Sequence, residues 1–371
     1  MSGLGGCGER TLVDASGERG GRGGLGLQDV LSGSEGFARA LGPMTFRFPR
    51  DHASHDDYRS EWWYVTANLH DERGGRWGIQ FTVFRQAIVP PAAVDVSRLR
   101  SRWRTGQLFL AHFALTDVSA GRHQAFERAA RGAMGLAGAE AEPFRVWVDG
   151  WTLESEGDAF MPQRLDVRTA SGLNLVLSLN AVKPMVLQGN RGFSAKSDEP
   201  GNASYYYAFT RLEAAGTLER DGESLMLSGT AWMDREWGTS VLGPEHAGWD
   251  WFALQLSDGR ELMVYRLRRR DGARDAYDAG TWVYRDGSSE HLETSDFELE
   301  PLDFWTDEHG TQWPARWQLV LARRGLTLEI EPVLSDQLMR TTLRYWEGAV
   351  DVTGSVNGVG YMELTGYGDE P

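Results

Sequence analysis

The sequence predicts an all-β protein that consists of two antiparallel β-barrels in tandem, with few short helices. Its 371 residues exceed what one ordinary hydrophobic core holds, so two domains are expected. From about residue 46 onward, apolar and polar residues alternate with the period of a half-buried strand. Many short strands separated by turns are typical of a sandwich or an up-and-down barrel. The 15 Trp, 15 Phe and 11 Tyr favour barrels, because a ligand cavity inside a barrel needs bulky apolar lining.

The chain divides into three predicted parts. Residues 1–44 are expected to form a tether, since residues 1–26 hold ten glycines and cannot offset chain entropy by burial. The first barrel is predicted over residues 45–224 and the second over residues 225–371. The segment 216–228 is interpreted as the junction between them.

Local patterns predict the individual elements. Two short helices are expected, at residues 28–41 and at residues 122–131, the second because it carries charge on one side. Strands are predicted where apolar residues recur at every second position, as at residues 79–83, 173–180 and 326–331. Hairpin turns are predicted between such runs at Asp258-Gly259, Asp286-Gly287 and Arg324-Gly325.

The charge balance excludes some classes of partner. With 38 basic and 53 acidic side chains, the net charge is −15. A nucleic-acid-binding protein needs basic side chains to neutralise phosphates, so no nucleic-acid partner is expected. The same charge disfavours docking on anionic lipid. The sequence contains no run of about 18 apolar residues, so no transmembrane helix is predicted.

The single cysteine, Cys7, excludes an intramolecular disulfide. Its context, Leu4-Gly5-Gly6-Cys7, resembles a bacterial lipobox, in which the cysteine carries the lipid anchor. The apolar segment that should precede a lipobox is missing, so the hypothesis requires a start further upstream or a signal already removed. The alternative is a chance cysteine in a glycine-rich tail.

The first candidate site lies in residues 51–64, which gather histidines, carboxylates and large aromatic residues. Strand alternation places Glu61 and Trp63 on one face, and Trp62 and Tyr64 on the other. If Glu61 points into a barrel beside Trp63, its pKa is expected to rise, which would make it an acid near neutral pH. The alternative is a polar loop that enters a strand, with Trp62 or Trp63 in the core.

No metal site and no cofactor site are predicted. His52 and His55 have a spacing that can bind a metal, but no third ligand follows at a meaningful distance. Nucleophile-elbow, P-loop and dinucleotide-binding motifs are also missing from the sequence.

The second candidate site combines residues 231–238 with residues 248–252. Trp232 and Asp234 share one face of a predicted strand. Trp249 and Trp251 share one face of the next strand. Such a density of tryptophans and acids exceeds what a solvated hairpin needs, which favours a functional site.

Two observations allow a purely architectural interpretation. Arg235 can pair with Glu236 or with Asp250, which would make these charges structural. The third aromatic stretch, residues 345–367, is interpreted as a closing pair of strands, with glycines where the sheet bends.

Together these stretches resemble the AttH-like family, whose members are described as lipocalin-like predicted secreted hydrolases and are related to carotenoid 1,2-hydratase (hydroxyneurosporene synthase). The resemblance covers about residues 46–367. It implies two lipocalin-like, or calycin-like, barrels and export to the periplasm or cell envelope, often as a lipoprotein, which fits Cys7. It also implies an ABC-transporter permease as a partner. The motifs that carry it are residues 48–52, 61–64, 232–238, 248–251, 345–348 and 363–367.

The hydratases of this group add water across a terminal isoprenoid double bond. Such chemistry needs an acid to protonate the alkene and aromatic faces to stabilise the cation. By the resemblance, Asp234 would be the acid and Glu61 would support it. The residues expected to bind the substrate are Trp62, Trp63, Tyr64, Trp232, Trp237, Trp249, Asp250 and Trp251.

The sequence departs from the hydratases at Arg235, where they carry a histidine next to the aspartate. A guanidinium does not exchange protons near neutral pH. We expect Arg235 to lower the pKa of Asp234, which is opposite to what an alkene-protonating acid requires.

Three functions are therefore open. The first is an enzyme, a hydratase or another acid–base enzyme such as a hydrolase, that acts on an apolar isoprenoid- or lipid-like substrate at Asp234 and Glu61. The second is a non-catalytic carrier of an apolar ligand that works beside an ABC transporter. The third is a structural lipoprotein.

Overall fold

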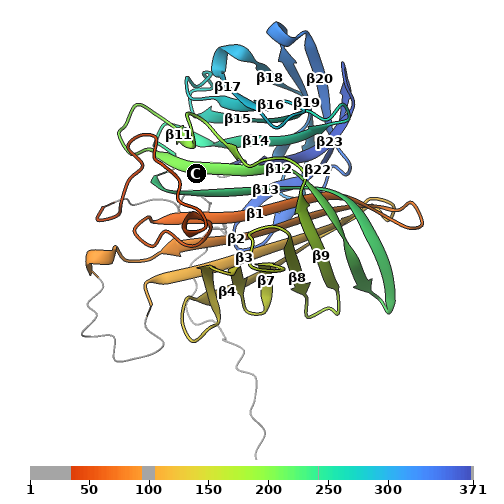
Figure 1. The fold of residues 1–371 in the computed structure, drawn as a ribbon. Helices are drawn as coiled ribbons and strands as arrows, with labels where there is room; N and C mark the ends of the chain where they lie inside the picture. Colours follow the sequence, from red (N-terminus) through yellow and green to blue (C-terminus); the bar gives the residue numbers. More distant parts are fainter. Residues whose placement is uncertain (1–34, 94–104, 241, 369–371) are drawn as a thin grey trace, which may run out of the picture.

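The structure is a computed structural model that describes residues 35–93, 105–240 and 242–368. Within these residues the strands form two antiparallel sheets (Figure 1), as the sequence predicts. No helix in this part of the chain has the length and apolar character needed to cross a membrane. The helical segments are short 3-10 turns, namely η1 (Arg50–His52), η2 (Pro91–Ala93), η4 (Thr294–Asp296) and η5 (Ala322–Arg324).

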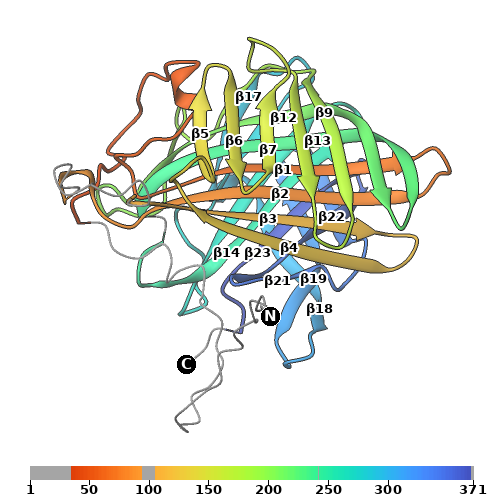
Figure 2. The ribbon, with the colours of Figure 1, turned by 90° about the horizontal axis from the view of Figure 1, so that it is seen from below.

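The first sheet has the strand order β4-β3-β2-β1-β13-β12-β9-β8-β7-β6-β5, and β10 and β11 also pair with β12. Its short strands β5 to β8 lie across the long strands β1 to β3, so that the sheet curls back on itself (Figure 2). The strands are β1 (Ser60–Asp71), β2 (Arg76–Ala87), β3 (Gln107–Asp117), β4 (Arg122–Arg131), β5 (Ala137–Ala141), β6 (Phe144–Val148), β7 (Trp151–Ser155), β8 (Gln163–Arg168), β9 (Asn174–Ala181), β10 (Val186–Leu187), β11 (Phe193–Ala195), β12 (Ala203–Arg220) and β13 (Glu223–Ser240).

The second sheet has the strand order β17-β16-β15-β14-β23-β22-β20-β19-β18, and β21 also pairs with β22. It lies above the first sheet in Figure 1. The strands are β14 (His246–Leu256), β15 (Glu261–Arg269), β16 (Ala279–Val283), β17 (Ser289–Glu293), β18 (Glu298–Thr306), β19 (Gln312–Leu321), β20 (Leu326–Pro332), β21 (Leu338–Arg340), β22 (Arg344–Gly354) and β23 (Gly358–Leu364).

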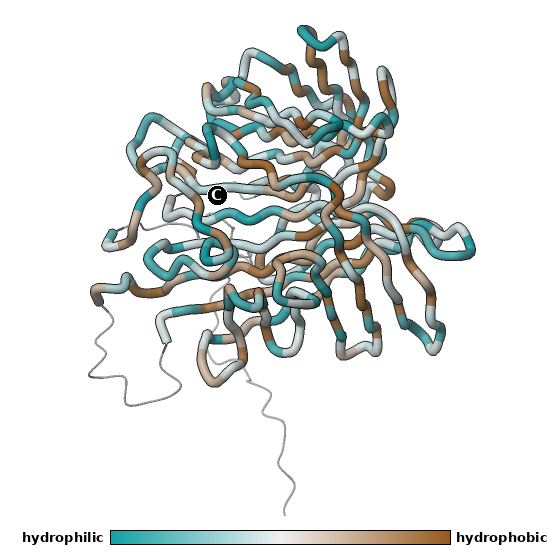
Figure 3. The backbone as a smooth tube through the Cα atoms, in the orientation of Figure 1, coloured by the Kyte–Doolittle hydropathy of each residue, from teal (hydrophilic) through white to brown (hydrophobic). Residues whose placement is uncertain are grey.

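The alternating patterns give the strands that the sequence predicts. Residues 79–83 lie in β2, the run at 173–180 gives β9, and residues 326–331 lie in β20. The predicted turns contain Gly259, Gly287 and Gly325, each with a positive φ that a turn between antiparallel strands requires. In Figure 3 hydrophobic segments lie along the strands, whereas many turns are hydrophilic.

The helix predicted at residues 122–131 is wrong, and the helix predicted at residues 28–41 is not found in its described part; residues 28–34 lie outside the described residues. Residues 122–131 form β4, which pairs with β3 along its whole length, and Phe126 stacks on Phe113 at a ring distance of 5.8 Å. Cross-strand pairing and this contact outweigh the helix propensity of the Ala, Glu and Arg residues. In the predicted helix at 28–41, the described residues 35–41 form a turn followed by irregular backbone.

The change from one sheet to the other occurs between Ser240 and His246. The predicted junction at residues 216–228 is instead a hairpin inside the first sheet, where β12 pairs with β13. Because β13 also pairs with β1, it extends the first sheet well past residue 224. Most of the predicted tether, including Cys7, lies outside the described residues.

Each curled sheet encloses its own hydrophobic core. The first core is built around Trp63, Phe81 and Trp151, and the second around Trp317 and Trp346, all at most 1% exposed. These large aromatic side chains fill the inside of each sheet. They pack there as core residues do, with dispersion contacts on all sides.

The outer faces of the two sheets pack against each other. A third buried cluster joins residues of β1, β12 and β13 to residues of β14, β15, β22 and β23. Asn68 Nδ2 donates to Gly360 O at 3.0 Å across this interface. Gln255 Nε2 donates to Thr210 O and Ala231 O, both at 2.8 Å. The central strands of both sheets are thus buried on both faces.

Gly78 lies where the two sheets pack closely, and this packing generates a stability prediction. A Cβ at this position would lie 2.9 Å from Tyr361 Oη and 3.0 Å from Ala349 Cβ. We expect Gly78→Val to lower the free energy of unfolding by about 1–3 kcal/mol, because overpacking forces the interface apart. Urea denaturation measures the effect. Gly157→Val is the control, since nothing lies near Gly157; equal stability of the two variants would contradict close packing at Gly78.

Candidate functional site

The candidate site is a pocket between the two sheets, not inside either one. Its cavity volume is about 80 Å³, and the space free of protein atoms reaches about 770 Å³ only when the part open to solvent is included. Both sheets contribute walls. The lining residues are Trp62, Tyr64, Thr82, Phe84, Lys196, Tyr206, Asp234, Glu236, Trp249, Trp251, Tyr265, Leu267 and Glu363.

Strand alternation and register build the wall from the first sheet. Trp62 and Tyr64 occupy alternate positions of β1, and their register partners on β13 are Glu236 and Asp234. Directly paired residues on antiparallel strands point to the same side of the sheet. Two aromatic residues and two carboxyl groups therefore face the second sheet together.

The wall from the second sheet follows the same rule. Trp251 on β14 is the register partner of Glu363 on β23, and of Tyr265 on β15. Trp249, two residues earlier on β14, donates its indole Nε1–H to Glu363 Oε1 at 2.8 Å. The rings of Trp251 and Tyr64 meet edge to face at 5.3 Å, so aromatic residues of the two sheets touch in the pocket.

Asp234 is a buried carboxyl group in this pocket and is 3% exposed. Trp232 Nε1 donates to its Oδ1 and Tyr206 Oη donates to its Oδ2, both at 2.7 Å. Burial raises the pKa of Asp234 to about 8, although these two hydrogen bonds lower it, and the nearby Glu236 and Glu363 raise it further. Asp234 therefore holds a proton at neutral pH.

Glu236 and Glu363 lie in the same pocket. Burial raises the pKa of Glu363 to about 7, although the hydrogen bond from Trp249 opposes the shift. Burial also raises the pKa of Glu236, although Lys196, 3.8 Å away, and the hydroxyl of Ser204 stabilise its charged form. Asp234 and Glu363, with pKa values of about 8 and about 7, are carboxyl groups suited to acid–base chemistry near neutral pH.

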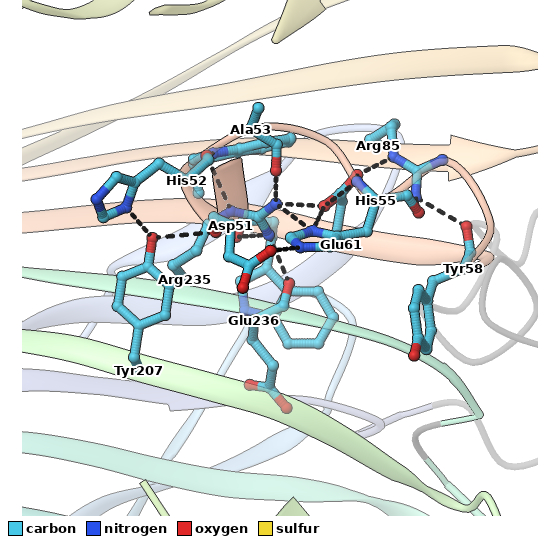
Figure 4. Close-up of polar contacts among 12 residues, drawn as sticks. Asp51, His52, Ala53, His55, Tyr58, Glu61, Arg85, Tyr207, Arg235 and Glu236 are labelled. Atoms are coloured by element: carbon cyan, nitrogen blue, oxygen red, sulfur yellow. Dashed lines mark hydrogen bonds and ion pairs between the residues drawn. The ribbon is translucent and has the colours of Figure 1, made fainter. Parts of the chain in front are cut away.

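Glu61 does not lie with Asp234. Its carboxylate is fully buried on the opposite face of β1, where it binds Arg85 and Arg235 (Figure 4). The backbone N–H of His55 donates to Glu61 Oε1 at 2.9 Å, which attaches the preceding loop to this ion cluster. The Arg235 guanidinium lies 4.0 Å from the ring centre of Trp63.

Two predicted pKa shifts are therefore wrong. Burial alone would raise the pKa of Glu61, but Arg85 and Arg235 hold it well below its usual value, so Glu61 is not an acid near neutral pH. Arg235 was expected to lower the pKa of Asp234. As its strand neighbour it points to the other face, and the pKa of Asp234 is raised.

The other predicted site residues divide between the two faces. Trp62, Tyr64, Trp249 and Trp251 line the pocket, and Trp232 contacts Asp234. Trp63 lies in the first core, and Trp237 stacks on His55 at 3.8 Å. Asp250 pairs with Arg266 at 2.8 Å on the far side of β14. Residues that are adjacent in the motifs alternate between pocket and core, which explains this division.

Several lining residues were not predicted from the sequence. Glu363 stands in the stretch interpreted as a closing pair of strands, and its acidic side chain was the available signal. Tyr206, Phe84, Tyr265 and Lys196 lie in ordinary strand or loop sequences. They reach the pocket only through pairing with distant strands, which local patterns do not reveal.

His52 and His55 are engaged by protein groups. His52 Nδ1 lies 2.6 Å from Tyr207 Oη, and His55 lies 3.2 Å from Glu61 and 3.4 Å from Asp51. In the described part of the chain no group of three or more His, Cys, Asp or Glu side chains is arranged to hold a metal ion.

Comparison with known proteins identifies the family. The family model described as AttH-like matches residues 39–367. The chain belongs to the AttH-like family. It is 32% identical to a putative AttH from Nitrosomonas europaea whose crystal structure matches with a TM-score of 0.78 over 89% of this chain and 100% of that one. No curated protein matches the chain.

The AttH-like fold is also that of a named enzyme. Kievitone hydratase from Nectria haematococca matches with a TM-score of 0.66 over 89% of this chain and 98% of that one. At 14% identity, the likeness shows the fold alone. The two curled sheets are thus the lipocalin-like fold that the sequence predicts.

The raised pKa of Asp234 predicts how stability depends on pH. Because the folded state holds this proton more tightly than the unfolded state, its contribution to stability is complete below pH 4 and is lost as pH rises through about 8. We expect Asp234→Asn, which stays neutral, to be more stable relative to the wild type at pH 8 than at pH 5. Urea unfolding at both pH values measures the difference in unfolding free energy between the variant and the wild type, with the exposed Asp158→Asn as control. If this difference is the same at pH 5 and at pH 8, Asp234 is not neutral in the folded protein.

The ion cluster predicts a large loss of stability in Glu61→Gln. The change leaves Arg85 and Arg235 buried without their carboxylate, which should cost about 3–5 kcal/mol. Glu154→Gln removes a partly exposed ion pair with Arg145 and should cost less than about 1 kcal/mol. Chemical denaturation of both variants tests the difference. A similar small loss in each would show that the cluster is not structural.

Proposed function

We propose that the pocket between the sheets is the active site of a hydratase that adds water to an alkene in an apolar, isoprenoid- or lipid-like substrate. The observation that carries the proposal is a buried, proton-bearing carboxyl group, Asp234, enclosed by aromatic rings of both sheets. The AttH-like family and a hydratase of the same fold are consistent with it, but the residues of this chain carry the proposal.

Asp234 is suited to protonate a double bond. A general acid works best when its pKa lies near the operating pH, and burial gives Asp234 a pKa of about 8. The hydrogen bonds from Trp232 and Tyr206 then stabilise the carboxylate that forms when the proton leaves. The proton can thus be held in the resting state and its loss can be accommodated.

The aromatic walls are suited to the cation that protonation creates. Tyr64, Trp249 and Trp251 surround the pocket from opposite sides, and the face of an aromatic ring attracts a cation. The carboxylate of Asp234 adds a negative charge nearby. Arg235 does not oppose the cation from inside the pocket, since its guanidinium binds Glu61 on the other face.

The proposed reaction balances in two steps. In the first, Asp234 gives its proton to one alkene carbon, and the other carbon becomes cationic. In the second, the oxygen of a water molecule bonds to the cationic carbon and loses a proton to Glu363 in its carboxylate form. Transfer of that proton back to Asp234, a neighbour in the same pocket, restores the starting state.

The alternative is a carrier that holds an apolar ligand without changing it. The observation in its favour is the same aromatic lining, because Trp62, Phe84, Trp249 and Leu267 would bind an apolar ligand whether or not Asp234 reacts. Export, a lipid anchor at Cys7, and an ABC-transporter permease as partner belong to this proposal as well. Intact mass analysis of the protein from native membranes tests the anchor, and an unmodified Cys7 would contradict it.

Incubation with isoprenoid alkenes tests the hydratase. We expect a product heavier by one water, with an activity that falls as pH rises through about 8 because Asp234 must be protonated. Asp234→Asn should reduce the rate by at least about 10²-fold. Mass spectrometry detects the product, and Asp158→Asn is the matched control.

Two outcomes would decide against catalysis at this site. Product formation that survives in Asp234→Asn would remove Asp234 as the acid. Lipid that co-purifies tightly with the native protein and is returned unchanged, with no hydrated product from any alkene, would support the carrier instead.

A further inference from the structure

A row of polar side chains crosses the first sheet from the pocket to the surface. Asp234, Tyr64, Thr82, His112 and Glu127 are successive register partners on β13, β1, β2, β3 and β4. Paired residues point to one side, so the row lies on the face that the second sheet covers. It begins in the pocket and ends at Glu127, whose side chain is 24% exposed.

The second sheet supplies groups that lie over this row. Glu347 on β22 is the register partner of Glu363 on β23, which lines the pocket. Tyr345 stands two residues before Glu347 and therefore shares its face. Glu347 and Tyr345 are both 1% exposed.

Hydrogen bonds join the groups in the outer half of this row. Tyr345 Oη lies 2.8 Å from His112 Nδ1, and His112 Nε2 lies 3.0 Å from Glu127 Oε2. The Tyr345 and His112 rings stack at 5.6 Å. Thr342 Oγ1 donates to Glu127 Oε1 at 2.6 Å, which holds the carboxylate in place at the surface.

Glu347 is a buried acid that the fold does not explain. Neither of its oxygens accepts a well-formed hydrogen bond within the described residues, although the hydroxyl groups of Tyr64 and Tyr345 lie next to it. Burial raises its pKa well above the usual value, and the adjacent Glu363 raises it further. A buried polar group without partners costs stability that an apolar residue would not, which points to a functional role.

We propose that Glu363, Glu347, Tyr345, His112 and Glu127 form a proton path between the pocket and solvent. Through it the acid groups of the pocket exchange protons with water while an apolar ligand fills the pocket. This use rests on the proposed function, but the path itself does not depend on which reaction the pocket performs.

The transfer along the path balances. Because Glu127 is a carboxylate that accepts from Nε2–H of His112, Nδ1 is free to accept the hydroxyl proton of Tyr345. Glu347 gives its proton to Tyr345 Oη, Tyr345 gives its own to Nδ1, and Nε2–H passes to Glu127. Glu347 becomes a carboxylate, Glu127 becomes neutral, and His112 changes tautomer. Transfer of a proton from Glu363 to Glu347 connects this relay to the pocket.

The surroundings of His112 suit this role. The titratable groups that face it are Glu127 from β4 and Tyr345 from β22, whereas β2 contributes the ring of Phe84 at 5.4 Å. Burial lowers the pKa of His112, and Glu127 opposes the shift only in part. The imidazole is therefore neutral at pH 7 and can accept a proton at one nitrogen while it donates from the other.

A pH-jump experiment without substrate tests the path. Time-resolved infrared spectroscopy follows the C=O band of the protonated buried carboxyl groups. The part of the band that disappears in Glu347→Gln is the signal of Glu347. We expect His112→Phe, which keeps a ring against Tyr345, to slow the relaxation of that band by about tenfold or more, equivalent to a barrier higher by about 1.4 kcal/mol. Glu127→Gln should slow it in the same direction.

Two matched variants control for unspecific effects. His246→Phe changes another buried histidine, which lies on β14 and binds Asp275 in the loop between β15 and β16, and Glu154→Gln changes another partly exposed glutamate. Neither variant should slow the relaxation of the C=O band. Circular dichroism verifies that all variants are folded. An unchanged relaxation in folded His112→Phe would overturn the path, whereas failure to hydrate alkenes would overturn only the proposed function.

Discussion

The structure depends on one constraint, the two-residue period of strands that are buried on both faces. On β13, Met233 and Arg235 face the inside of the first sheet, whereas Trp232 and Asp234 face the second sheet. Ordinary surface strands present one of their faces to water. Here the second face is covered as well, so every residue of this segment occupies one of two distinct interiors.

These two interiors give adjacent charges opposite behaviour. Glu61 lies between two guanidinium groups and is held as a carboxylate, whereas Asp234 lies among aromatic rings and other acids and is held neutral. Tyr64, the register partner of Asp234, is only three residues from Glu61. The sheet itself separates the charged cluster from the neutral acid, so the protein stabilises both without either neutralising the other.

Much of the fold could be predicted from the sequence, because strands and turns depend on local patterns. Alternation located β2, β9 and β20, and it correctly separated Glu61 and Trp63 from Trp62 and Tyr64. The helix predicted at β4 failed because pairing with β3 is a tertiary interaction. The location of the pocket could not be predicted, because it depends on how two sheets dock. For the same reason the contributions of Tyr206 and Lys196 became visible only in the structure.

The position of the pocket at a seam has a consequence for how its specificity can change. A cavity inside a barrel can be resized only by replacing the side chains that line it. A cavity between two sheets also changes width when the sheets tilt or slide, and their separation here is set by small residues such as Gly78 and Ala349, which lie outside the pocket. Under the proposed function, substitutions at these remote positions would alter the size of the ligand that the pocket accepts, while Asp234 and its hydrogen-bond donors stay in place.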